Sequence, residues 1–330
     1  MTRRLQILLA LHPSPNIQEP WNSINIEALK KNHELRILDR SKPCEPQFEG
    51  IEAVVDFGGQ MTDEEIDFAS RAGAKFMQVQ TTGLDHVNIS KILETGMLFA
   101  NCPGQFSSVT LAQSAMMFIL NMAHEYGPAR QNFSKGEWYN PVATELGGRT
   151  LGIIGFGSSG QDLARRAKPF GMRIMAIDVR PIEQEVLDEI EPDFLGSPDD
   201  LDRVIAESDF ISLHLHLNEE TRHTIDERRI GLMKSTACLV NVSRGPLVDE
   251  QALFEALLEG RIGGAGLDVF ETEPPDLTLP VFQLPNVYLT PHTAGSSDGT
   301  ARKRAQHAVD NLGRFARGEP LVGQITGTAG

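Results

Sequence analysis

The sequence predicts an α/β protein built of two doubly wound parallel-sheet domains, and three observations lead to this prediction. Short runs of apolar and β-branched residues alternate with helical patterns along most of the 330 residues. The alternation forms two series, one before about residue 100 and one after about residue 150. The second series opens with a glycine-rich turn between a strand and a helix. Alternation of this kind produces βαβ units and parallel sheets.

The first series contains five candidate strands, each short and apolar. They are Gln6–Leu11, Leu35–Leu38, Ala53–Phe57, Phe76–Gln80 and Met97–Ala100. Between the third and fourth strands, Thr62 and Glu65 form the capping-box pattern that begins a helix, which we expect to end near Gly73.

The segment from Ser108 to Tyr126 predicts a long helix that is apolar on nearly all sides. A helix of this kind is buried, so we expect it at a domain or subunit junction. It is too polar at its ends to span a membrane.

The second series contains six candidate strands, the number that a Rossmann-like sheet requires. They are Thr150–Ile154, Arg173–Ile177, Phe210–Leu213, Cys238–Val242, Gly264–Leu267 and Val287–Thr290. Helical patterns include Ser197–Glu207, Asp249–Glu259 and, at the end of the chain, Ser296–Arg317.

Two segments rich in glycine and proline mark the domain boundaries. They lie at Asn101–Gly104 and Pro291–Gly295. We therefore expect residues 1–100 and 294–330 to form one flavodoxin-like domain, and residues 101–293 to form a second domain inserted into it.

The charge balance excludes some classes of partner. The chain has 45 acidic and 30 basic residues, a net charge of −15, which disfavours binding to nucleic acid or to a membrane surface. Cys44, Cys102 and Cys238 are far apart and show no CxxC spacing, so we expect neither a disulfide framework nor a metal site. A reducing, cytoplasmic location fits this pattern.

The glycine-rich turn has the GxGxxG pattern of a dinucleotide site. Gly155 permits the tight turn, Gly157 lets a pyrophosphate approach the backbone, and Gly160 lets helix and strand pack closely. Asp178 follows the next strand, where it would bind the ribose hydroxyls of NAD. Arg180 keeps NADP as the less favoured alternative.

Further polar residues follow the other strands of the second series. They are His214, Ser243, Arg244, Asp268 and His292. Because ligands of open α/β sheets bind beyond the carboxyl ends of strands, we expect these residues to share one edge with the glycine turn.

An arginine, a histidine and a carboxylate at such an edge suit hydride transfer between a nicotinamide and a small anionic 2-oxo or 2-hydroxy acid. The guanidinium of Arg244 matches a carboxylate with two parallel hydrogen bonds. His292 can give and take the proton, and a neighbouring carboxylate would raise its pKa. Glu271 and Glu273 are both candidates for that carboxylate, and the chemistry does not choose between them.

Four ordered motifs resemble the D-isomer-specific 2-hydroxyacid dehydrogenases, a family that includes phosphoglycerate dehydrogenases and glyoxylate/hydroxypyruvate reductases. The motifs are LGIIGFGSSG at 151–160, NVSRGPLVD at 241–249, GLDVFETEPP at 266–275 and LTPHTAG at 289–295. The resemblance covers nearly the whole chain. It implies that residues 101–293 bind NAD and that the other domain binds substrate.

The resemblance also implies roles for individual residues. Arg244 would anchor the substrate, and Glu273 would pair with the acid/base His292. The N–H groups of Thr82 and Gly83 would bind the substrate carboxylate. Cofactor contacts would come from Gly155, Gly157, Ser158, Ser159, Gly160, Asp178, His214, Val242, Ser243, Asp268 (to the nicotinamide carboxamide), His292, Ala294 and Gly295. The resemblance and the apolar helix together predict a homodimer formed through the cofactor domain.

The sequence departs from the family pattern at several positions. Gln113 and Ser114 stand where Glu-His is common, and His216 stands where proline is usual. Ala294 and Thr81 each replace a glycine that is common in the family, and with Thr81 in the substrate loop we expect the pocket to differ in shape from that of the relatives.

Other functions on this fold remain open. Formate dehydrogenases typically carry glutamine at the position of Glu273, whereas phosphite dehydrogenases use a similar Arg–Glu–His set. A different class is an NAD(H)-responsive corepressor-like binding protein, because some corepressors resemble this family and retain the three residues.

Overall fold

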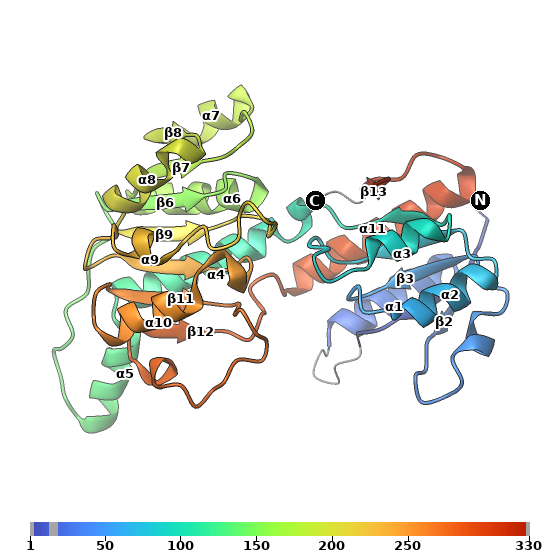
Figure 1. Cartoon of the computed structure of the whole chain (residues 1–330), viewed down its shortest axis with the longest axis horizontal. Coiled ribbons are helices and arrows are strands. Elements are labelled where there is room, and N and C mark those ends of the chain that lie inside the picture. Colours follow the sequence, from blue (N-terminus) through green and yellow to red (C-terminus); the bar gives the residue numbers. More distant parts are fainter. Residues whose placement is uncertain (1–2, 13–18, 328–330) are drawn as a thin grey trace. The chain divides into compact units, whose positions relative to one another are not determined.

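The computed structural model of the protein describes residues 3–12 and 19–327. The chain divides into two compact units. Unit 1 comprises Met1–Phe106 and Ser297–Gly330, and unit 2 is the continuous segment Ser107–Ser296 between them. Each unit is built around its own parallel sheet, which confirms the predicted α/β class (Figure 1).

Unit 1 contains a six-stranded sheet with the order β13-β5-β4-β3-β1-β2. Its strands are β1 (Gln6–Ala10), β2 (Glu34–Ile37), β3 (Ala53–Asp56), β4 (Phe76–Val79), β5 (Leu98–Ala100) and β13 (Gln324–Ile325). The first five are parallel, and β13 returns from the end of the chain to pair antiparallel with β5. All five strands expected in this region are present, with ends that differ by one residue.

Helices cover both faces of the unit 1 sheet. They are α1 (Trp21–Asn32), α2 (Asp63–Arg71), α3 (Ile89–Glu94) and α11 (Asp298–Arg317). Leu29 of α1 and Leu312 of α11 are fully buried in one core, whereas Ile66 of α2 and Ile92 of α3 belong to the core on the opposite face. The capping box predicted at the start of α2 is confirmed.

Unit 2 contains a seven-stranded, all-parallel sheet with the order β12-β11-β10-β9-β6-β7-β8. Its strands are β6 (Thr150–Ile154), β7 (Arg173–Ile177), β8 (Phe194–Gly196), β9 (Phe210–Leu213), β10 (Cys238–Asn241), β11 (Gly264–Leu267) and β12 (Val287–Leu289). The six predicted strands are present. The seventh, β8, was not predicted, because this three-residue edge strand is only half-buried and shows no alternation of apolar and polar residues.

Seven helices are seen in the described part of unit 2. They are α4 (Ser108–Ala123), α5 (Tyr126–Lys135), α6 (Ser158–Ala167), α7 (Gln184–Ile190), α8 (Leu201–Glu207), α9 (Glu227–Ile230) and α10 (Glu250–Leu258). Side chains of α4 and α6 share one core, and those of α8, α9 and α10 share the core on the other face. Among the helices described in either unit, none has the length and apolar character needed to cross a membrane.

The helix predicted from Ser108 to Tyr126 is present as α4, which ends three residues earlier, at Ala123. Glu125 has a left-handed backbone (φ 45°), and a separate helix α5 follows. The buried side of α4 packs inside unit 2, where the Phe118 ring lies so close to Gly266 that a Cβ there would be 2.5 Å away. Gln113 and Met117 are exposed on the other side, so α4 is not apolar and buried all round.

Candidate active site

The glycine-rich turn connects β6 to α6. Gly155 has φ 94°, and a Cβ at this position would lie 2.5 Å from the carbonyl oxygen of His214. A Cβ at Gly160 would lie 2.3 Å from the carbonyl oxygen of Gly155, so the third glycine lets the helix pack on the turn. Among the described residues, a Cβ added at Gly157 would meet only the Arg180 side chain, and Gly157 itself, the residue before α6, has no side chain to cap the helix. Ser158 is exposed at the start of α6. This uncapped helix end fits the pyrophosphate of a dinucleotide.

Asp178 follows β7 and reaches back to the glycine turn. One carboxylate oxygen accepts a hydrogen bond from the N–H of Phe156 (2.9 Å). The other accepts from the N–H and the Nε of Arg180 (2.9 and 3.2 Å). If Gly157 carried a Cβ, that atom would lie 3.3 Å from the Arg180 guanidinium. An acidic and a basic side chain therefore stand together at the turn, where the adenosine end of a dinucleotide would bind.

His214 follows β9 and is hydrogen-bonded on both ring nitrogens. Nε2 lies 2.9 Å from Ser212 Oγ, and Nδ1 lies 3.0 Å from Ser159 Oγ in the first turn of α6. Burial lowers the pKa of His214 to about 4, so the ring is neutral at physiological pH. A neutral imidazole has one donor and one acceptor nitrogen, which makes it a rigid bridge between the strand end and the glycine turn.

Arg244 lies in a tight turn after β10. The buried side chain of Asn241 closes this turn: its Nδ2 donates to the Arg244 carbonyl (2.8 Å), and its Oδ1 accepts from the Ser243 N–H (3.1 Å). The Ser243 hydroxyl donates to the Leu213 carbonyl at the end of the neighbouring strand (2.7 Å). Val242, predicted to end the strand, is buried just beyond it. Sequence reasoning did not single out Asn241.

Asp268 follows β11 and organises the turn that carries His292. Its side chain is buried, and its oxygens accept hydrogen bonds from the Thr290 hydroxyl (2.5 Å), the Thr293 N–H (2.7 Å) and the Ala294 N–H (2.9 Å). Burial raises the pKa of Asp268, while these hydrogen bonds and the charge of His292 oppose the rise. Oδ1 thus accepts two of these hydrogen bonds and Oδ2 accepts the third.

His292 is paired with Glu273. Its Nδ1 lies 2.6 Å from Glu273 Oε2, and Glu273 Oε1 accepts from the N–H of Phe270 (3.1 Å). The hydrogen bond to Glu273 is the main cause that raises the pKa of His292; burial and the charge of Arg244 oppose it. The pKa of Glu273 is lowered, because the contact with His292 outweighs the opposing effect of burial. His292 itself has φ 54°, a left-handed conformation that is uncommon outside glycine.

Glu271, the other candidate carboxylate, points to different partners. Its Oε1 lies 2.8 Å from Nε2 of His223 and 3.6 Å from Arg222. Its N–H donates to Glu250 (3.0 Å), a half-buried carboxyl whose pKa is raised by burial. The structure therefore places Glu273, and not Glu271, against His292. Glu250 was not singled out from the sequence, because its proximity to this loop arises only in the fold.

The residues at which the sequence departs from the family pattern have local roles. Ser114 of α4 donates a hydrogen bond to the Ala294 carbonyl (3.1 Å), and thereby supports the turn after His292. Ala294 is buried, and a Cβ added at the following Gly295 would lie 3.8 Å from the Leu111 side chain. Thr82 and Gly83, which the resemblance assigns to the substrate, lie in unit 1 after β4.

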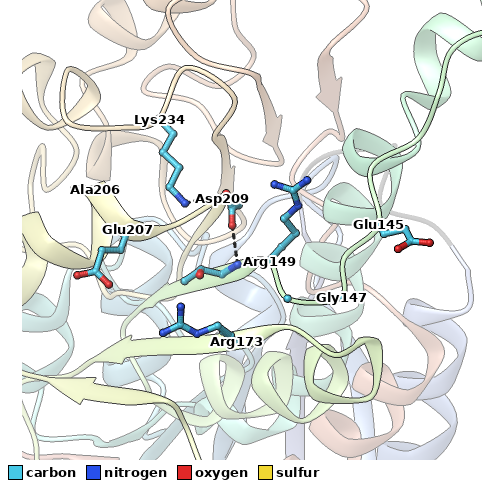
Figure 2. A pocket seen from close by; sticks show the side chains of 10 residues that line it. Glu145, Gly147, Arg149, Arg173, Ala206, Glu207, Asp209 and Lys234 are labelled. Atoms are coloured by element: carbon cyan, nitrogen blue, oxygen red, sulfur yellow. Dashed lines mark hydrogen bonds and ion pairs between the residues drawn. The ribbon is translucent and has the colours of Figure 1, made fainter.

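A depression of about 720 Å³ lies at the opposite edge of the unit 2 sheet (Figure 2). It is lined by residues at the amino ends of β6 and β7 and before β9. Its charges are balanced, and Asp209 pairs with Lys234 (2.9 Å) and accepts from the Thr150 N–H (2.8 Å). Since ligands of such sheets bind at the carboxyl ends of strands, the edge that carries His292, and not this depression, is the candidate active site.

Within residues 3–12 and 19–327, no group of three or more His, Cys, Asp or Glu side chains is placed to hold a metal ion. The groups at the carboxyl edge instead form an anion-binding helix end, a cation at Arg244 and a coupled acid–base pair. This set can bind an anion and move one proton.

Comparisons with known proteins show which family the chain resembles. Residues 116–294 match the family described as D-isomer specific 2-hydroxyacid dehydrogenase, NAD binding domain. The chain is 37% identical over 292 residues to the glyoxylate reductase of Korarchaeum cryptofilum, covering 86% of this chain and 83% of that protein. It is 40% identical over 234 residues to the hydroxypyruvate reductase of Thermotoga maritima, covering 70% and 74%.

A solved structure resembles nearly the whole chain in fold. The D-lactate dehydrogenase of Aquifex aeolicus, described in complex with NAD and lactic acid, matches with a TM-score of 0.79 and 27% identity. The match covers 98% of this chain and 100% of that one.

We predict that Glu273→Gln lowers the pKa of His292, because the substitution removes the charge that holds the proton on the ring. In the native protein the imidazolium persists to higher pH than in a free histidine, and in the variant it should lose its proton at lower pH. NMR titration of the His292 ring measures the shift directly. Glu271→Gln is the matched control and should leave the titration unchanged. A shift in the control and none in Glu273→Gln would contradict the assigned pairing.

Proposed function

The chain belongs to the D-isomer-specific 2-hydroxyacid dehydrogenases, a family of NAD(P)-dependent enzymes that act on 2-oxo and 2-hydroxy acids. We propose that it transfers a hydride between NAD(H) and a small D-2-hydroxy acid or 2-oxo acid. The observation that carries this proposal is the His292–Glu273 pair at the same strand edge as Arg244 and the uncapped end of α6.

The nicotinamide supplies or accepts the hydride, and the protein has to bind the organic acid and move one proton. Arg244 provides the cation for the substrate carboxylate and carbonyl. Its guanidinium is planar and permanently charged, so it can hold a carboxylate in a single orientation. Its charge acts on both His292 and Glu273, which supports its place in the same site.

His292 is the acid in reduction and the base in oxidation. Reduction requires the charged imidazolium, which donates its proton to the carbonyl oxygen as the hydride arrives. Glu273 keeps that proton available by raising the pKa of the ring. Oxidation requires the neutral ring, so the two directions should have opposite pH dependences.

NAD is the proposed cofactor. The Asp178 carboxylate at the glycine turn can accept hydrogen bonds from ribose hydroxyls and repel a 2′-phosphate. Arg180 could favour a 2′-phosphate, but its guanidinium is paired with Asp178.

The substrate is proposed to be small. Both curated relatives described above are named for reductases of two- or three-carbon 2-oxo acids, so glyoxylate and hydroxypyruvate are the first substrates to test. Thr82 and Gly83 are proposed to bind the carboxylate through their N–H groups.

Steady-state kinetics with glyoxylate, hydroxypyruvate, pyruvate, 2-oxoglutarate and branched 2-oxo acids, each with NADH and NADPH, test the proposal. We expect saturable reduction of at least one small 2-oxo acid. A protein that turns over none of them but assembles on NADH would instead be a nucleotide-responsive binding protein. Turnover of phosphite alone would identify a phosphite dehydrogenase.

We predict that Arg244→Lys greatly impairs the reaction although it keeps the charge. Lysine cannot reproduce two parallel hydrogen bonds to a carboxylate, so the expected loss of transition-state stabilisation is about 2–4 kcal/mol. The measurement is kcat/KM with the best 2-oxo acid. Near-native activity would place Arg244 outside the site.

Asp178→Ala should weaken the use of NADH and relax the discrimination against NADPH, since it removes the ribose acceptor and releases Arg180. The ratio of kcat/KM for the two cofactors reports this effect. Asp178→Ala with Arg180→Ala is the control, because the gain with NADPH should disappear when the guanidinium is absent. An unchanged ratio in the single variant would show that Asp178 does not bind the ribose.

We also propose that the protein is a homodimer formed through unit 2. Large apolar side chains are exposed along α4, α5 and the segment that follows; they are Met117, Tyr126, Phe133, Trp138, Tyr139 and Val142. Two of them, Phe133 and Trp138, are in ring contact (5.9 Å between centroids), and exposed apolar surface of this kind can bind another protein.

Analytical ultracentrifugation at micromolar concentration should show a species of twice the chain mass. Replacing Phe133 and Trp138 together by serine should shift it toward the single chain, because both side chains are mostly exposed (72% and 68%) and unit 2 does not need them for its core. The same double change at Leu277 and Val179, which are also exposed, is the control and should leave the dimer intact. A native protein that sediments only as a single chain would refute the dimer.

A further inference from the structure

The loop after β4 in unit 1 is held by two hydrogen bonds to successive carbonyl groups. The N–H of Cys102 donates to the Thr81 carbonyl (3.0 Å). The side-chain Nδ2 of Asn101 donates to the Thr82 carbonyl (2.9 Å). Both donors come from the segment that follows β5, so both carbonyls point toward that segment.

These two contacts determine where the next N–H groups point. In a trans peptide the N–H is antiparallel to the C=O of the same unit, and both peptide units here are trans. The N–H groups of Thr82 and Gly83 therefore point together, away from Asn101 and Cys102. Across residues 3–12 and 19–327, neither N–H donates a hydrogen bond to the protein. Two successive N–H groups that point the same way form a site for an anion.

The backbone N–H and carbonyl of Asn101 are both hydrogen-bonded. Its N–H donates to the Gly323 carbonyl (3.0 Å), and its carbonyl accepts from Nε2 of His307 (3.1 Å). A carbonyl can only accept, so Nε2 of His307 carries the proton. Gly323 has φ 72°, and a Cβ there would lie 2.8 Å from the Asn101 carbonyl oxygen. The position therefore needs glycine.

The final segment of the chain holds this arrangement in place. Asn311 of α11 exchanges two hydrogen bonds with the backbone of Val322 (2.9 and 3.0 Å), one residue before Gly323. Its Nδ2 also donates to Gln78 of β4 (2.7 Å). Asn311 and Gln78 are fully buried, so α11 and the strand before the loop form one rigid support for Asn101.

We propose that Asn101 is a positioning residue, whose carboxamide aims the N–H groups of Thr82 and Gly83 at the carboxylate of the substrate. This inference rests on the proposed function, because it takes the anion to be the carboxylate of a 2-oxo acid. The Asn101 carboxamide holds the loop from its carbonyl side, opposite to the N–H groups, and needs no contact with the substrate. A carbonyl without the Asn101 donor can rotate, and the N–H groups then lose their common direction.

Asn101→Ala tests the role of the donor, and Asn101→Asp keeps the shape while replacing the donor by an acceptor that repels the Thr82 carbonyl. Binding of oxalate, a dicarboxylate probe, is measured by calorimetry in the presence of NADH, alongside KM, kcat and the Kd of NADH. We expect the oxalate Kd and the KM to rise ~10-fold in Asn101→Ala, the size of one lost hydrogen bond, and further in Asn101→Asp. The Kd of NADH should stay within about twofold, since the glycine turn lies in the other unit.

Asn25→Ala is the matched control. Asn25 is a buried asparagine of the same unit whose Nδ2 also donates to a backbone carbonyl, that of Trp21, at 2.9 Å. It should lower the Tm without changing the oxalate Kd. Native oxalate binding in both Asn101 variants, or an equal loss in Asn25→Ala, would overturn the positioning role. Because oxalate binding does not depend on turnover, these results are separate from the kinetic assay that decides the proposed function.

Discussion

The buried carboxylate of Asp268 is the constraint on which the chemistry of unit 2 depends. It accepts three hydrogen bonds from the turn between Thr290 and Ala294, and its own carbonyl accepts from the N–H of His292 (2.8 Å). These contacts hold His292 in a left-handed conformation that would otherwise be unfavourable. In that conformation the ring meets Glu273. The contact with Glu273 that raises the pKa of His292 therefore depends on the turn that the Asp268 carboxylate holds.

Unit 1 also has a buried carboxylate at a strand end that accepts hydrogen bonds from the N–H groups of a turn. The buried carboxylate of Asp56, the last residue of β3, accepts from four successive N–H groups, those of residues 58–61. The carbonyl of Gly58 in that turn then binds Nε2 of His86 (2.9 Å), in the loop that contains Thr82 and Gly83. Asn101 acts on the same loop from the neighbouring strand. In both units, a buried polar side chain at the end of one strand shapes a loop that begins at another.

The difference between local patterns and contacts of residues far apart in the chain explains which features could be predicted from the sequence. The strands, the glycine turn and the polar residues after each strand depend on local patterns. The sequence therefore predicted the places of Asp178, His214, Arg244, Asp268 and His292 beyond the strand ends. Strand β8 and helix α5 were missed, because the first is half-buried and the second buries no side chain, which leaves neither with a clear pattern. The hydrogen bonds of Asp268 and Asn101 join residues about 20 or more positions apart. They depend on the order of strands in the sheet, which no local pattern contains.

The most direct test of this account is the titration of His292 in Asp268→Asn. The asparagine amide keeps the size of the side chain, but it has one acceptor oxygen where the carboxylate has two. Its NH₂ group cannot accept a hydrogen bond, so at least one backbone N–H of the turn loses its acceptor. We expect the turn to relax, the Glu273 contact to weaken and the pKa of His292 to fall toward its ordinary value of about 6.5, with a parallel fall in kcat for reduction. If His292 titrated as in the native protein and kcat were unchanged, Asp268 would not be what positions the acid–base pair.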